Sequence, residues 1–466
     1  MIFTFSQISV MLYTKNRAIG VYMHQYLQKA VWGLIAPLLI TQLYASEQTH
    51  MKQSCEEKAA TVYHLKPETI HTAVPRFLYD RYSVYGKSPK NTEEALFFVC
   101  HYDKSGKFMT LNVETDKRPQ TLQQTEKMQQ LVERTVKQYS HDMNDTAIRL
   151  LVKKNGHTYK AAAGLADREH NRSVKVDDLF EIGSATKVFT GIAIFQLIES
   201  GKLSLETKLS TFYPKGEITQ LANYQGKNYW NEVTVGMLLR HTSGFIDYLN
   251  VYNDDTKALK ILGGKEKHFT FDALIHQAVT FGDANFKPGA AFKYCNTGYI
   301  ILGEIISKVS GMDWRDYIQK HILDRAGMKH TYFGSRIPKS LREHMPKGYM
   351  HFKEVFMAPS LAGSAGEIIS TLDDLATLMH AWGSGRLYDD PHTLAFQLEK
   401  GFQLQAADQI SNLYYGYAIM KLEGFYGHGG QTFGFQSYMA TKPQTGETYI
   451  VSTNDSTVSS MNLFMG

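Results

Sequence analysis

The sequence predicts an α+β fold: an antiparallel sheet flanked by helices, a mostly helical lobe beside it, and a small α+β extension at the N-terminus. β-prone runs lie near both ends of the long C-terminal region, around residues 147–163 and 436–453. Most of the sequence between them carries apolar residues at helical spacing. Strands at both ends with helices between them indicate one sheet assembled from the two termini.

Composition restricts the possible functions. The chain has 466 residues, with 50 Lys and Arg against 45 Asp and Glu, and its net charge of +5 is spread along the sequence. Without a run of basic residues to follow a phosphate backbone, nucleic acid is not expected as a partner. Cys55, Cys100 and Cys295 lack the spacing of a zinc site, so we expect neither a metal nor a cofactor.

Residues 1–46 contain a candidate export signal. A basic residue precedes an uncharged apolar run over residues 30–40, and small residues follow it, which is the arrangement of a secretory signal peptide. The run is shorter than the roughly 20 apolar residues of a membrane-spanning helix. A start at Met23 instead of Met1 would bring the signal closer to the N-terminus. We expect an exported protein, periplasmic or secreted, whose first segment is either cleaved or kept as a membrane anchor.

Residues 47–120 are predicted to form a separate N-terminal extension. A polar, helical start over residues 47–65 leads to two β-prone runs within residues 95–113, and the Gly-containing turn between them predicts a hairpin. In an oxidising compartment Cys55 and Cys100 can form a disulfide, and the sequence leaves open whether they do. Nothing in this extension suggests chemistry.

Residues 121–466 are predicted to form the main domain. Apolar spacing predicts an amphipathic helix over 121–139. Asn155-Gly156 lies between two β-prone runs and predicts a hairpin, because both turn positions tolerate positive φ. Thr371-Leu-Asp-Asp374 is typical of a capped helix start. Further helices are expected over 187–200, 235–240, 298–310 and 372–382, and strands over 414–420, 436–441 and 448–453.

Ser184 and Lys187 are the strongest candidates for chemistry. They are three residues apart, so they share one face of the predicted helix. Ser184 lies at the helix N-terminus, where free N–H groups favour a developing negative charge. A lysine with a lowered pKa can accept the proton of a serine nucleophile. Because Ser-x-x-Lys is a common sequence, the same residues also fit a helix cap and a solvated lysine.

Tyr294 and Asn296 suit the same chemistry. They lie on a tight loop that opens the helix at Gly298. A phenol can relay a proton to a leaving group, and a carboxamide can hold a substrate amide or the lysine. Taken alone, the pair equally fits a buried tyrosine and a turn asparagine.

The sequence His428-Gly429-Gly430-Gln431 is a third candidate segment. A glycine-rich strand lets a substrate backbone approach closely, and its N–H groups can point towards a substrate. A lone histidine is more often structural, so His428 also fits a role in packing.

In this order, the three segments resemble the motifs of the serine β-lactamase and penicillin-binding (DD-peptidase) superfamily, most closely its class C β-lactamase-like branch. The resemblance runs from about Thr121 to the C-terminus and leaves residues 47–120 unexplained. Other segments are similar to that branch: Gly201–Leu205 with Tyr213-Pro214, Leu238–Gly244, Gly327-Met328 and Thr371–Asp374.

The resemblance implies a role for each candidate residue. Ser184 matches the acylated nucleophile, and Lys187 matches the base that accepts its proton. Tyr294 matches a tyrosine that assists proton transfer and activates the deacylating water. Asn296 matches the residue that orients substrate and lysine, and the backbone N–H groups of Ser184 and Gln431 would form the oxyanion hole.

The sequence departs from the family at the third motif. His428-Gly429-Gly430 stands where the family often has Lys-Thr-Gly. Histidine is largely neutral at its ordinary pKa, and Gly429 has no hydroxyl to hold a substrate carboxylate. A weaker anion site argues against a dedicated β-lactamase, whose substrates carry that carboxylate.

Two other segments are interpreted as structural. His241-Thr-Ser-Gly244 is expected to end a helix, with Gly244 at the C-cap. The segment 362–366 resembles the Gly-x-Ser-x-Gly elbow of α/β-hydrolases, and Asp373 or Asp374 follows it in the order that fold requires. The elbow needs a strand directly before it, and a proline lies there instead, so we expect a glycine-rich turn.

We therefore expect an exported serine acyl-hydrolase that works through a covalent acyl-enzyme. The preferred activity is that of a DD-peptidase or related amidase on a small-molecule or peptide substrate, with peptidoglycan as one candidate. The alternatives are an esterase or weak β-lactamase, and a non-catalytic member that binds peptidoglycan or a protein. Contact with a membrane is expected only through the first segment, if it is uncleaved.

Overall fold

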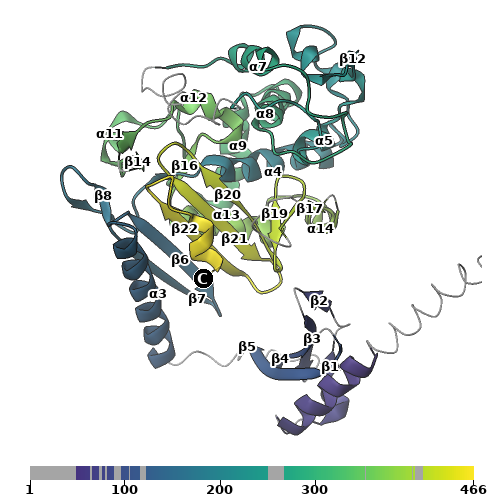
Figure 1. The fold of residues 1–466 in the computed structure, drawn as a ribbon, viewed down its shortest axis with the longest axis vertical. Helices are drawn as coiled ribbons and strands as arrows, with labels where there is room; N and C mark the ends of the chain where they lie inside the picture. The colour runs from purple at the N-terminus through teal and green to yellow at the C-terminus, as the bar shows by residue number, and fades with distance from the viewer. Residues whose placement is uncertain are drawn as a thin grey trace, which may run out of the picture. The chain divides into compact units, whose positions relative to one another are not determined.

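The computed structural model describes residues 49–62, 64, 66–72, 76–78, 81–88, 96–103, 105–115, 122–249, 267–351, 353–400, 402–404 and 413–465. The chain divides into two compact units, Met1–Gln120 and Thr121–Gly466, both shown in Figure 1. The predicted export signal within residues 1–46 lies outside the described residues. Over the part of the chain that the structure describes, no helix is long and apolar enough to cross a membrane.

The first unit combines a helix over residues 49–62 with one sheet. In the sheet, the strand order is β1-β3-β4-β5, and β2 pairs with β3. The predicted hairpin is confirmed, because β4 and β5 pair in antiparallel fashion. The elements are η1 (Pro67–Thr69), β1 (His71–Thr72), β2 (Arg76–Leu78), β3 (Arg81–Ser88), β4 (Leu96–Asp103) and β5 (Phe108–Thr115).

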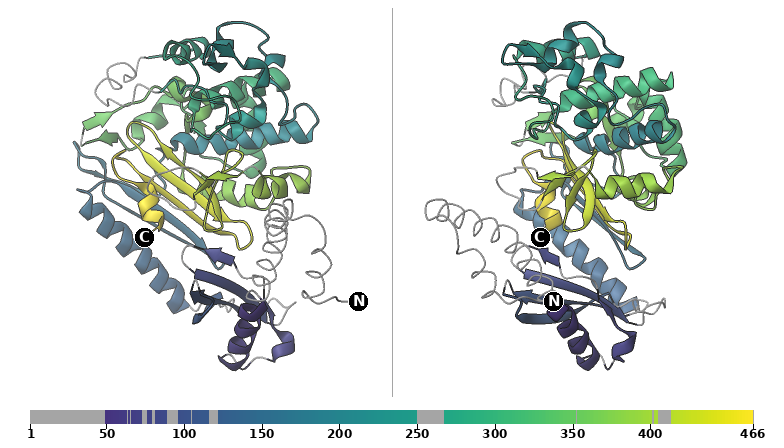
Figure 2. Two further views of the ribbon diagram at one scale, coloured as in Figure 1. Left: turned by 45° about the vertical axis from the view of Figure 1, so that its right-hand side comes forward. Right: turned by 90° about the vertical axis from the view of Figure 1, so that its right-hand side faces the viewer.

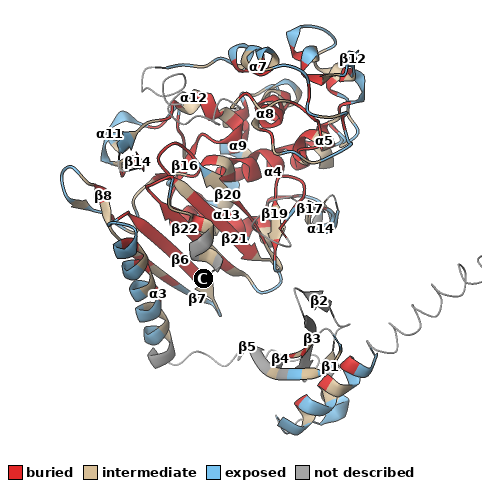
Figure 3. Ribbon diagram, viewed as in Figure 1, coloured by how far each residue is buried: buried red, intermediate tan, exposed pale blue. Residues whose placement is uncertain are grey.

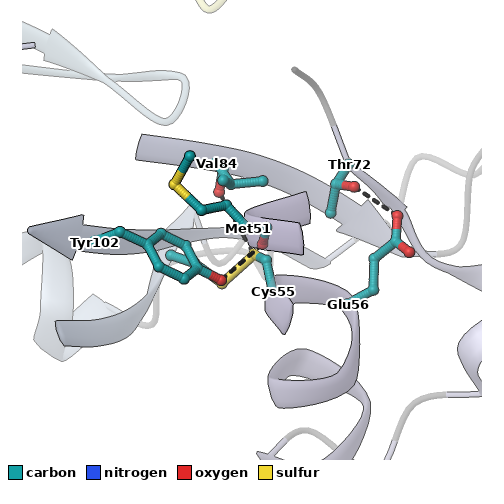
Figure 4. Close-up of a disulfide and its surroundings, with 7 residues drawn as sticks. Met51, Cys55, Glu56, Thr72, Val84 and Tyr102 are labelled. Carbon is teal, nitrogen blue, oxygen red and sulfur yellow. Dashed lines mark hydrogen bonds between the residues drawn. A yellow bond between two sulfur atoms is a disulfide. The ribbon is translucent and has the colours of Figure 1, made fainter. Parts of the chain in front are cut away.

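A disulfide joins the helix of this unit to its sheet. Cys55 on the helix is bonded to Cys100 on β4, 45 residues away (Figure 4). Met51, Cys55 and Ala59 recur every four residues along the helix and are buried. The Tyr102 hydroxyl donates to the backbone oxygen of Met51 at 2.8 Å. The disulfide lies in the core of a unit that is too small to build a large hydrophobic core.

The second unit is built on an eight-stranded sheet of order β17-β18-β19-β20-β21-β22-β6-β7. Its paired strands are antiparallel. β22, near the C-terminus, pairs with β6, near the start of the unit, as Figures 1 and 2 show, which confirms the sheet predicted from the two ends. The strands are β6 (Ile148–Lys154), β7 (His157–Ala163), β17 (Gln403–Leu404), β18 (Tyr414–Tyr415), β19 (Met420–Leu422), β20 (Phe425–Gln431), β21 (Gln436–Lys442) and β22 (Glu447–Thr453).

Turn chemistry explains one success and one error in this sheet. Asn155 and Gly156 both adopt positive φ, +52° and +78°, and connect β6 to β7 as predicted. The single strand predicted over 414–420 is wrong. The chain forms two short strands there, β18 and β19, which pair with each other. Between them, Ala418 adopts a φ of +61°. Alanine rarely adopts a positive φ, so the sequence does not predict a turn there.

Helices cover both faces of the sheet and build the lobe. Val132 and Val136 of α3 pack on Leu150 and Val152 of β6, whereas Leu151 belongs to the main core on the opposite face. The helices are α3 (Leu122–Asp142), α4 (Thr186–Glu199), α5 (Val235–Leu239), α7 (Phe271–Thr280), α8 (Asn296–Ser310), α9 (Trp314–Ile318), α10 (Asp324–Ala326), α11 (Lys339–His344), α12 (Pro359–Ala362), α13 (Leu372–Gly383), α14 (Pro391–Glu399) and α15 (Ser460–Met465).

The central helix α4 is buried along nearly its whole length. Residues Thr186–Leu197 are all buried, and Figure 3 shows this helix among the other buried segments of the second unit. Because α4 is apolar on every side, it occupies the core instead of the surface. A lysine in its first turn therefore lies inside the protein.

Short elements complete the unit. The small sheet β10-β16-β13 holds the segment that leads into α4. The short strands are β8 (Leu165–Asp167), β9 (Arg172–Ser173), β10 (Phe180–Glu181), β11 (Asn223–Tyr224), β12 (Lys227–Asn228), β13 (Tyr332–Phe333), β14 (Gly348–Met350), β15 (Lys353–Val355) and β16 (Ile368–Ser370). The short helical turns are η2 (Gly183–Ala185), η3 (Leu209–Thr211), η4 (Glu217–Ala222), η5 (Trp230–Glu232), η7 (Gln319–Leu323) and η8 (Gly363–Ala365).

The predicted helix ends are mostly confirmed. The Thr371 hydroxyl accepts a hydrogen bond from the Asp374 N–H at 3.2 Å, so it caps α13. The interpretation of Gly244 as a C-cap is wrong. α5 is capped by Arg240, and the left-handed residue that follows is His241, with a φ of +57°.

Candidate active site

Ser184 lies in the short turn η2, immediately before α4, and its side chain is partly exposed. Gly183 adopts a φ of +51°, and a Cβ at this position would lie 2.6 Å from the backbone nitrogen of Gln431. The Ser437 hydroxyl donates to the Ile182 oxygen at 2.8 Å. The structure therefore brings the end of β20 directly against the turn that carries Ser184.

Gly430 is required for this close approach. A Cβ at Gly430 would lie 1.8 Å from the Ile182 oxygen. From Gly430, the cross-strand row continues through Ser437 and Ser452 to Arg149 on β6. Arg149 is fully buried and donates to the backbone oxygen of Asp178 at 3.1 Å. The sheet thus holds the segment before the serine at two places.

Lys187 is fully buried, and its amine lies among three oxygen atoms. Its Nζ is 3.1 Å from Ser184 Oγ, 2.7 Å from Asn296 Oδ1 and 2.8 Å from the backbone oxygen of Ala365. Ser184 and Lys187 therefore form the close pair that their spacing predicts. The contact with Ala365 could not be read from the sequence, because a backbone oxygen leaves no residue signature.

Burial lowers the pKa of Lys187 to about 7, although the nearby Asp247 carboxylate acts to raise it. A neutral amine has two hydrogens and one lone pair. The carbonyl oxygens of Asn296 and Ala365 can only accept hydrogen bonds, so they take both hydrogens. The lone pair is then left facing the Ser184 hydroxyl, the arrangement that a general base requires.

Tyr294 lies beside this pair. Its ring centre is 4.9 Å from Lys187 Nζ. Its hydroxyl is buried and has no hydrogen-bond partner of ordinary geometry among the described residues. Burial raises the pKa of Tyr294 well above its ordinary value, and the Ser184 side chain acts in the opposite direction. The phenol therefore keeps its proton and has free hydrogen-bonding capacity next to the serine.

Asn296 begins α8, and its side chain is held from both ends. Its Oδ1 accepts from Lys187, and its Nδ2 donates to Asp247 Oδ2 at 2.8 Å. The Asn296 backbone N–H donates to the same carboxylate oxygen at 2.8 Å. Asp247 is a site residue that the sequence analysis missed. It lies three residues beyond Gly244, the end of the segment that is similar to the family. The sequence marks it only as an acidic residue in an otherwise uncharged, apolar stretch.

His428 is brought close to the other candidates, but its side chain is buried and neutral. Its Nδ1 donates to the backbone oxygen of Gly429 at 2.5 Å, so its Nε2 accepts from the Tyr415 hydroxyl at 2.9 Å. Burial, followed by the nearby charge of Lys187, lowers the pKa of His428 to about 3. His428 therefore offers no positive charge to a substrate. Gly429 and Gly430 are partly exposed, and the Gln431 side chain is exposed.

His241 is a second residue whose surroundings the sequence analysis missed. Its ring centre lies 4.1 Å from that of Tyr294, 5.0 Å from Tyr299 and 4.6 Å from Tyr415. Its Nδ1 accepts from the Cys295 N–H at 3.0 Å. Burial, followed by Lys187, lowers the pKa of His241 well below its ordinary value. A neutral histidine therefore packs against the tyrosine of the site.

The alternative serine is structural. Ser364 is buried and its hydroxyl donates to the Tyr299 oxygen at 2.9 Å. The helix α12 precedes its turn, η8, where an α/β-hydrolase elbow needs a strand. Asp374 accepts from the His330 N–H and the Thr331 hydroxyl instead of from a histidine side chain. The prediction of a glycine-rich turn is confirmed.

One cluster among the described residues has the composition of a metal site. Asp167, Glu169 and His170 place ligand atoms within 4.8 Å of one another. The Lys347 ammonium already lies 3.4 Å from Asp167 and 3.2 Å from Glu169. A lysine thus already pairs with both carboxylates, and they belong to segments other than those that carry Ser184.

Comparisons with known proteins identify relatives of both units of the chain. The Beta-lactamase family model matches residues 132–462, and the YsaB-like lipoprotein model matches residues 41–114. Penicillin-binding protein 4* of Bacillus subtilis is 31% identical over 204 residues, which are 43% of this chain and 41% of that protein. The chain thus matches less than half the length of this curated relative.

Solved structures share the fold. The D-amino acid amidase from Ochrobactrum anthropi SV3 superposes with a TM-score of 0.60 at 22% identity, covering 71% of this chain and 91% of the amidase. A D-stereospecific amidohydrolase from Streptomyces sp. superposes with a TM-score of 0.59 at 24% identity, covering 72% and 96%. At these identities the likeness shows the fold alone, over about seven tenths of this chain.

Proposed function

The chain belongs to the β-lactamase family of serine hydrolases, whose model matches residues 132–462, and we propose that it is an exported acyl-hydrolase in which Ser184 forms a covalent acyl-enzyme. The observation that carries this proposal is the position of the Lys187 amine. It lies 3.1 Å from Ser184 Oγ, with two carbonyl oxygens taking its hydrogens. A buried lysine with a pKa of about 7 suits a general base at neutral pH.

The proposed reaction has two stages. Ser184 Oγ attacks a substrate carbonyl while its proton passes to Lys187, and the negative charge on the carbonyl oxygen faces the backbone N–H groups of Ser184 and Gln431. Tyr294 then donates its proton to the leaving group and takes up the proton that Lys187 holds, so both residues return to their starting forms as the acyl-enzyme forms. In the second stage, a water molecule attacks the acyl carbonyl while its proton passes through the same phenol and lysine to Ser184 Oγ, which releases the acid and restores the serine hydroxyl.

An amide or peptide is the preferred substrate class. His428 is neutral and buried, so the triplet His428-Gly429-Gly430 offers no charged group for the carboxylate of a β-lactam. Two proteins of the same fold are described as an amidase and an amidohydrolase that act on D-configured substrates. A relative in sequence is a penicillin-binding protein. Together these support a DD-peptidase-like or related amidase, with cell-wall peptides as one candidate substrate.

Export is supported by three observations on the N-terminal region. The apolar run over residues 30–40 has the pattern of a secretory signal. The YsaB-like lipoprotein model matches residues 41–114. The disulfide between Cys55 and Cys100 is of a kind that persists in oxidising compartments.

Active-site labelling tests the proposal. The purified protein is treated with a fluorescent penicillin and with a fluorophosphonate, and in parallel with a panel of D-amino acid amides and esters. We expect the fluorophosphonate to label the protein and Ser184→Ala to abolish the labelling. Hydrolysis of amides in preference to esters would support the amidase, and the reverse preference would favour an esterase.

Ser364→Ala is the matched control, because Ser364 is the serine of the alternative motif and its hydroxyl is buried. This variant is expected to label like the wild type. A wild-type protein that neither probe labels would contradict the proposal and support a binding protein without catalysis. Labelling that survives in Ser184→Ala would show that another nucleophile is used.

A further inference from the structure

We propose that Asp247 is a positioning residue: by holding the amide nitrogen of Asn296, it keeps the Asn296 oxygen on Lys187 and so directs the lone pair of Lys187 to Ser184. This inference rests on the proposed function, because it assigns a direction to the base of that reaction. It concerns a residue that touches neither Ser184 nor a substrate.

The hydrogen bonds of Asp247 allow the side-chain amide of Asn296 one orientation. Oδ2 of Asp247 accepts from both the backbone N–H and the side-chain Nδ2 of Asn296, each at 2.8 Å. Oδ1 accepts from the Leu249 N–H at 2.9 Å. A carboxylate can only accept hydrogen bonds, so the end of the Asn296 amide that faces Asp247 must be the nitrogen. The oxygen end then faces Lys187, 2.7 Å from Nζ.

The reversed amide would disable the base. If Asn296 turned by 180° about its terminal bond, its NH2 group would face Lys187. A neutral amine meeting that donor would offer it the lone pair, and one of its own hydrogens would point at Ser184 instead. The Ala365 oxygen accepts from Lys187 in either case, so the Asn296 amide alone decides where the lone pair points. Asp247 makes this reversal costly by leaving an acceptor opposite an acceptor.

Among the residues that the structure describes, Asp247 is the carboxylate that acts on Lys187. It raises the pKa of Lys187 against the effect of burial, while burial raises the pKa of the Cys295 thiol to about 12 and so keeps it uncharged. Two tyrosine rings face the amine, with centres 4.9 Å (Tyr294) and 5.3 Å (Tyr299) from Nζ. The neighbouring histidines, His241 and His428, are buried with lowered pKa values and stay neutral. Removing the Asp247 charge therefore lowers the pKa of Lys187.

The test is the rate of fluorophosphonate labelling as a function of pH, measured on the full chain. Asp247→Asn keeps the size of the side chain and removes its charge. We expect its plateau rate to fall by about tenfold or more, because the Asn296 amide loses its fixed partner. We also expect the acid limb of the profile, the range in which the rate rises as Lys187 loses its proton, to move to lower pH. The pKa of Lys187 falls because the lysine loses a nearby negative charge.

A swapped pair provides the rescue. In Asp247→Asn combined with Asn296→Asp, the carboxylate stands at position 296, where it offers Lys187 only acceptors, and the new amide at 247 can donate to it. The NH2 group of that amide also faces the backbone N–H of residue 296, which donates to Asp247 in the wild type, so we expect the plateau rate to rise above that of Asp247→Asn without reaching the wild-type rate. The acid limb should move above that of the wild type, because the negative charge now contacts the lysine. A merely structural Asp247 predicts no such recovery.

Asp374→Asn is the matched control, because Asp374 is another buried acid that accepts from a backbone N–H and a hydroxyl. It should lower the unfolding temperature without moving the acid limb.

Two results would overturn the inference. One is an Asp247→Asn variant whose plateau rate and acid limb match those of the wild type, and the other is a swapped pair that is no faster than Asp247→Asn alone. If Asp247→Asn does not fold, hydrogens on the Asn296 atom facing Lys187, seen at atomic resolution in the wild type, would equally overturn it. Absence of wild-type labelling would instead overturn the proposed function.

Discussion

The two sides of the candidate site each bury a base, and burial leaves only one of them with a pKa near neutral pH. On the α4 side, burial lowers the pKa of Lys187 to about 7, and Asp247 acts to hold it up. On the β20 side, burial, followed by the nearby charge of Lys187, lowers the pKa of His428 to about 3. Burial is common to both and lowers both pKa values by similar amounts, from 10.5 for the lysine and from 6.5 for the histidine, so the ordinary pKa of each group decides which side titrates near neutral pH. Only the lysine side can exchange a proton at working pH.

This difference separates the residues proposed for proton transfer from the residue that would bind a substrate carboxylate. The residues around Ser184 retain the partners that proton transfer needs, whereas His428 is tied to Tyr415 and Gly429 by its two ring nitrogens. On the proposed mechanism, the site thus keeps the partners of a nucleophilic serine without a charged group at position 428 to select carboxylated substrates. Replacing one residue on each side should show the contrast directly, with the largest effects on the lysine side.

The largest effect is expected for Lys187→Met. Without the base, the fluorophosphonate labelling rate at pH 7 should fall by about 10² to 10⁴-fold. In the wild type, the lysine is protonated below pH 7 and neutral above it, so the rate should rise with pH through about 7 and then level off. The variant should lack this limb. A limb that persists in Lys187→Met would assign it to another group and break the comparison.

Tyr294→Phe should have the next largest effect. The Tyr294 hydroxyl is buried and makes no hydrogen bond of ordinary geometry among the described residues, so its removal should hardly change the unfolding temperature. Turnover of amide substrates should nevertheless fall by about 10²-fold or more, because the leaving amine loses its proton donor. The measurement pairs steady-state kinetics with thermal unfolding of the same samples. Equal losses of activity and stability would mean that the tyrosine only packs.

Local patterns explain how much of this architecture the sequence reveals. Asn155-Gly156 predicts its hairpin because both turn residues tolerate positive φ. Ala418 is not a typical turn residue, so the sequence does not predict the break between β18 and β19. Ser184 and Lys187 are predictable as a pair because they share one helix face. The disulfide between Cys55 and Cys100 is not predictable, since spacing alone does not reveal which cysteines meet in space.

Long-range contacts explain what the sequence analysis missed. Asp247 meets Asn296 across 49 residues, and His241 meets the Cys295 N–H across 54. Neither contact has a periodicity or a turn signal, because folding alone brings these segments together. The residues that adjust the pKa of Lys187 are thus harder to predict than the residues that share its motif.

His428→Gln should have the smallest effect. Histidine with a pKa of about 3 is neutral throughout the working range, and glutamine is also neutral, so no charge changes. The labelling rate should stay within a few fold of the wild type, and the acid limb should not move. The hydrogen bonds to Tyr415 and Gly429 can be lost, at a cost of about 1 kcal/mol each in unfolding free energy. A large loss of activity towards anionic substrates, confined to low pH, would instead show that His428 carries a proton in the substrate complex, and the two sides of the site would then work alike.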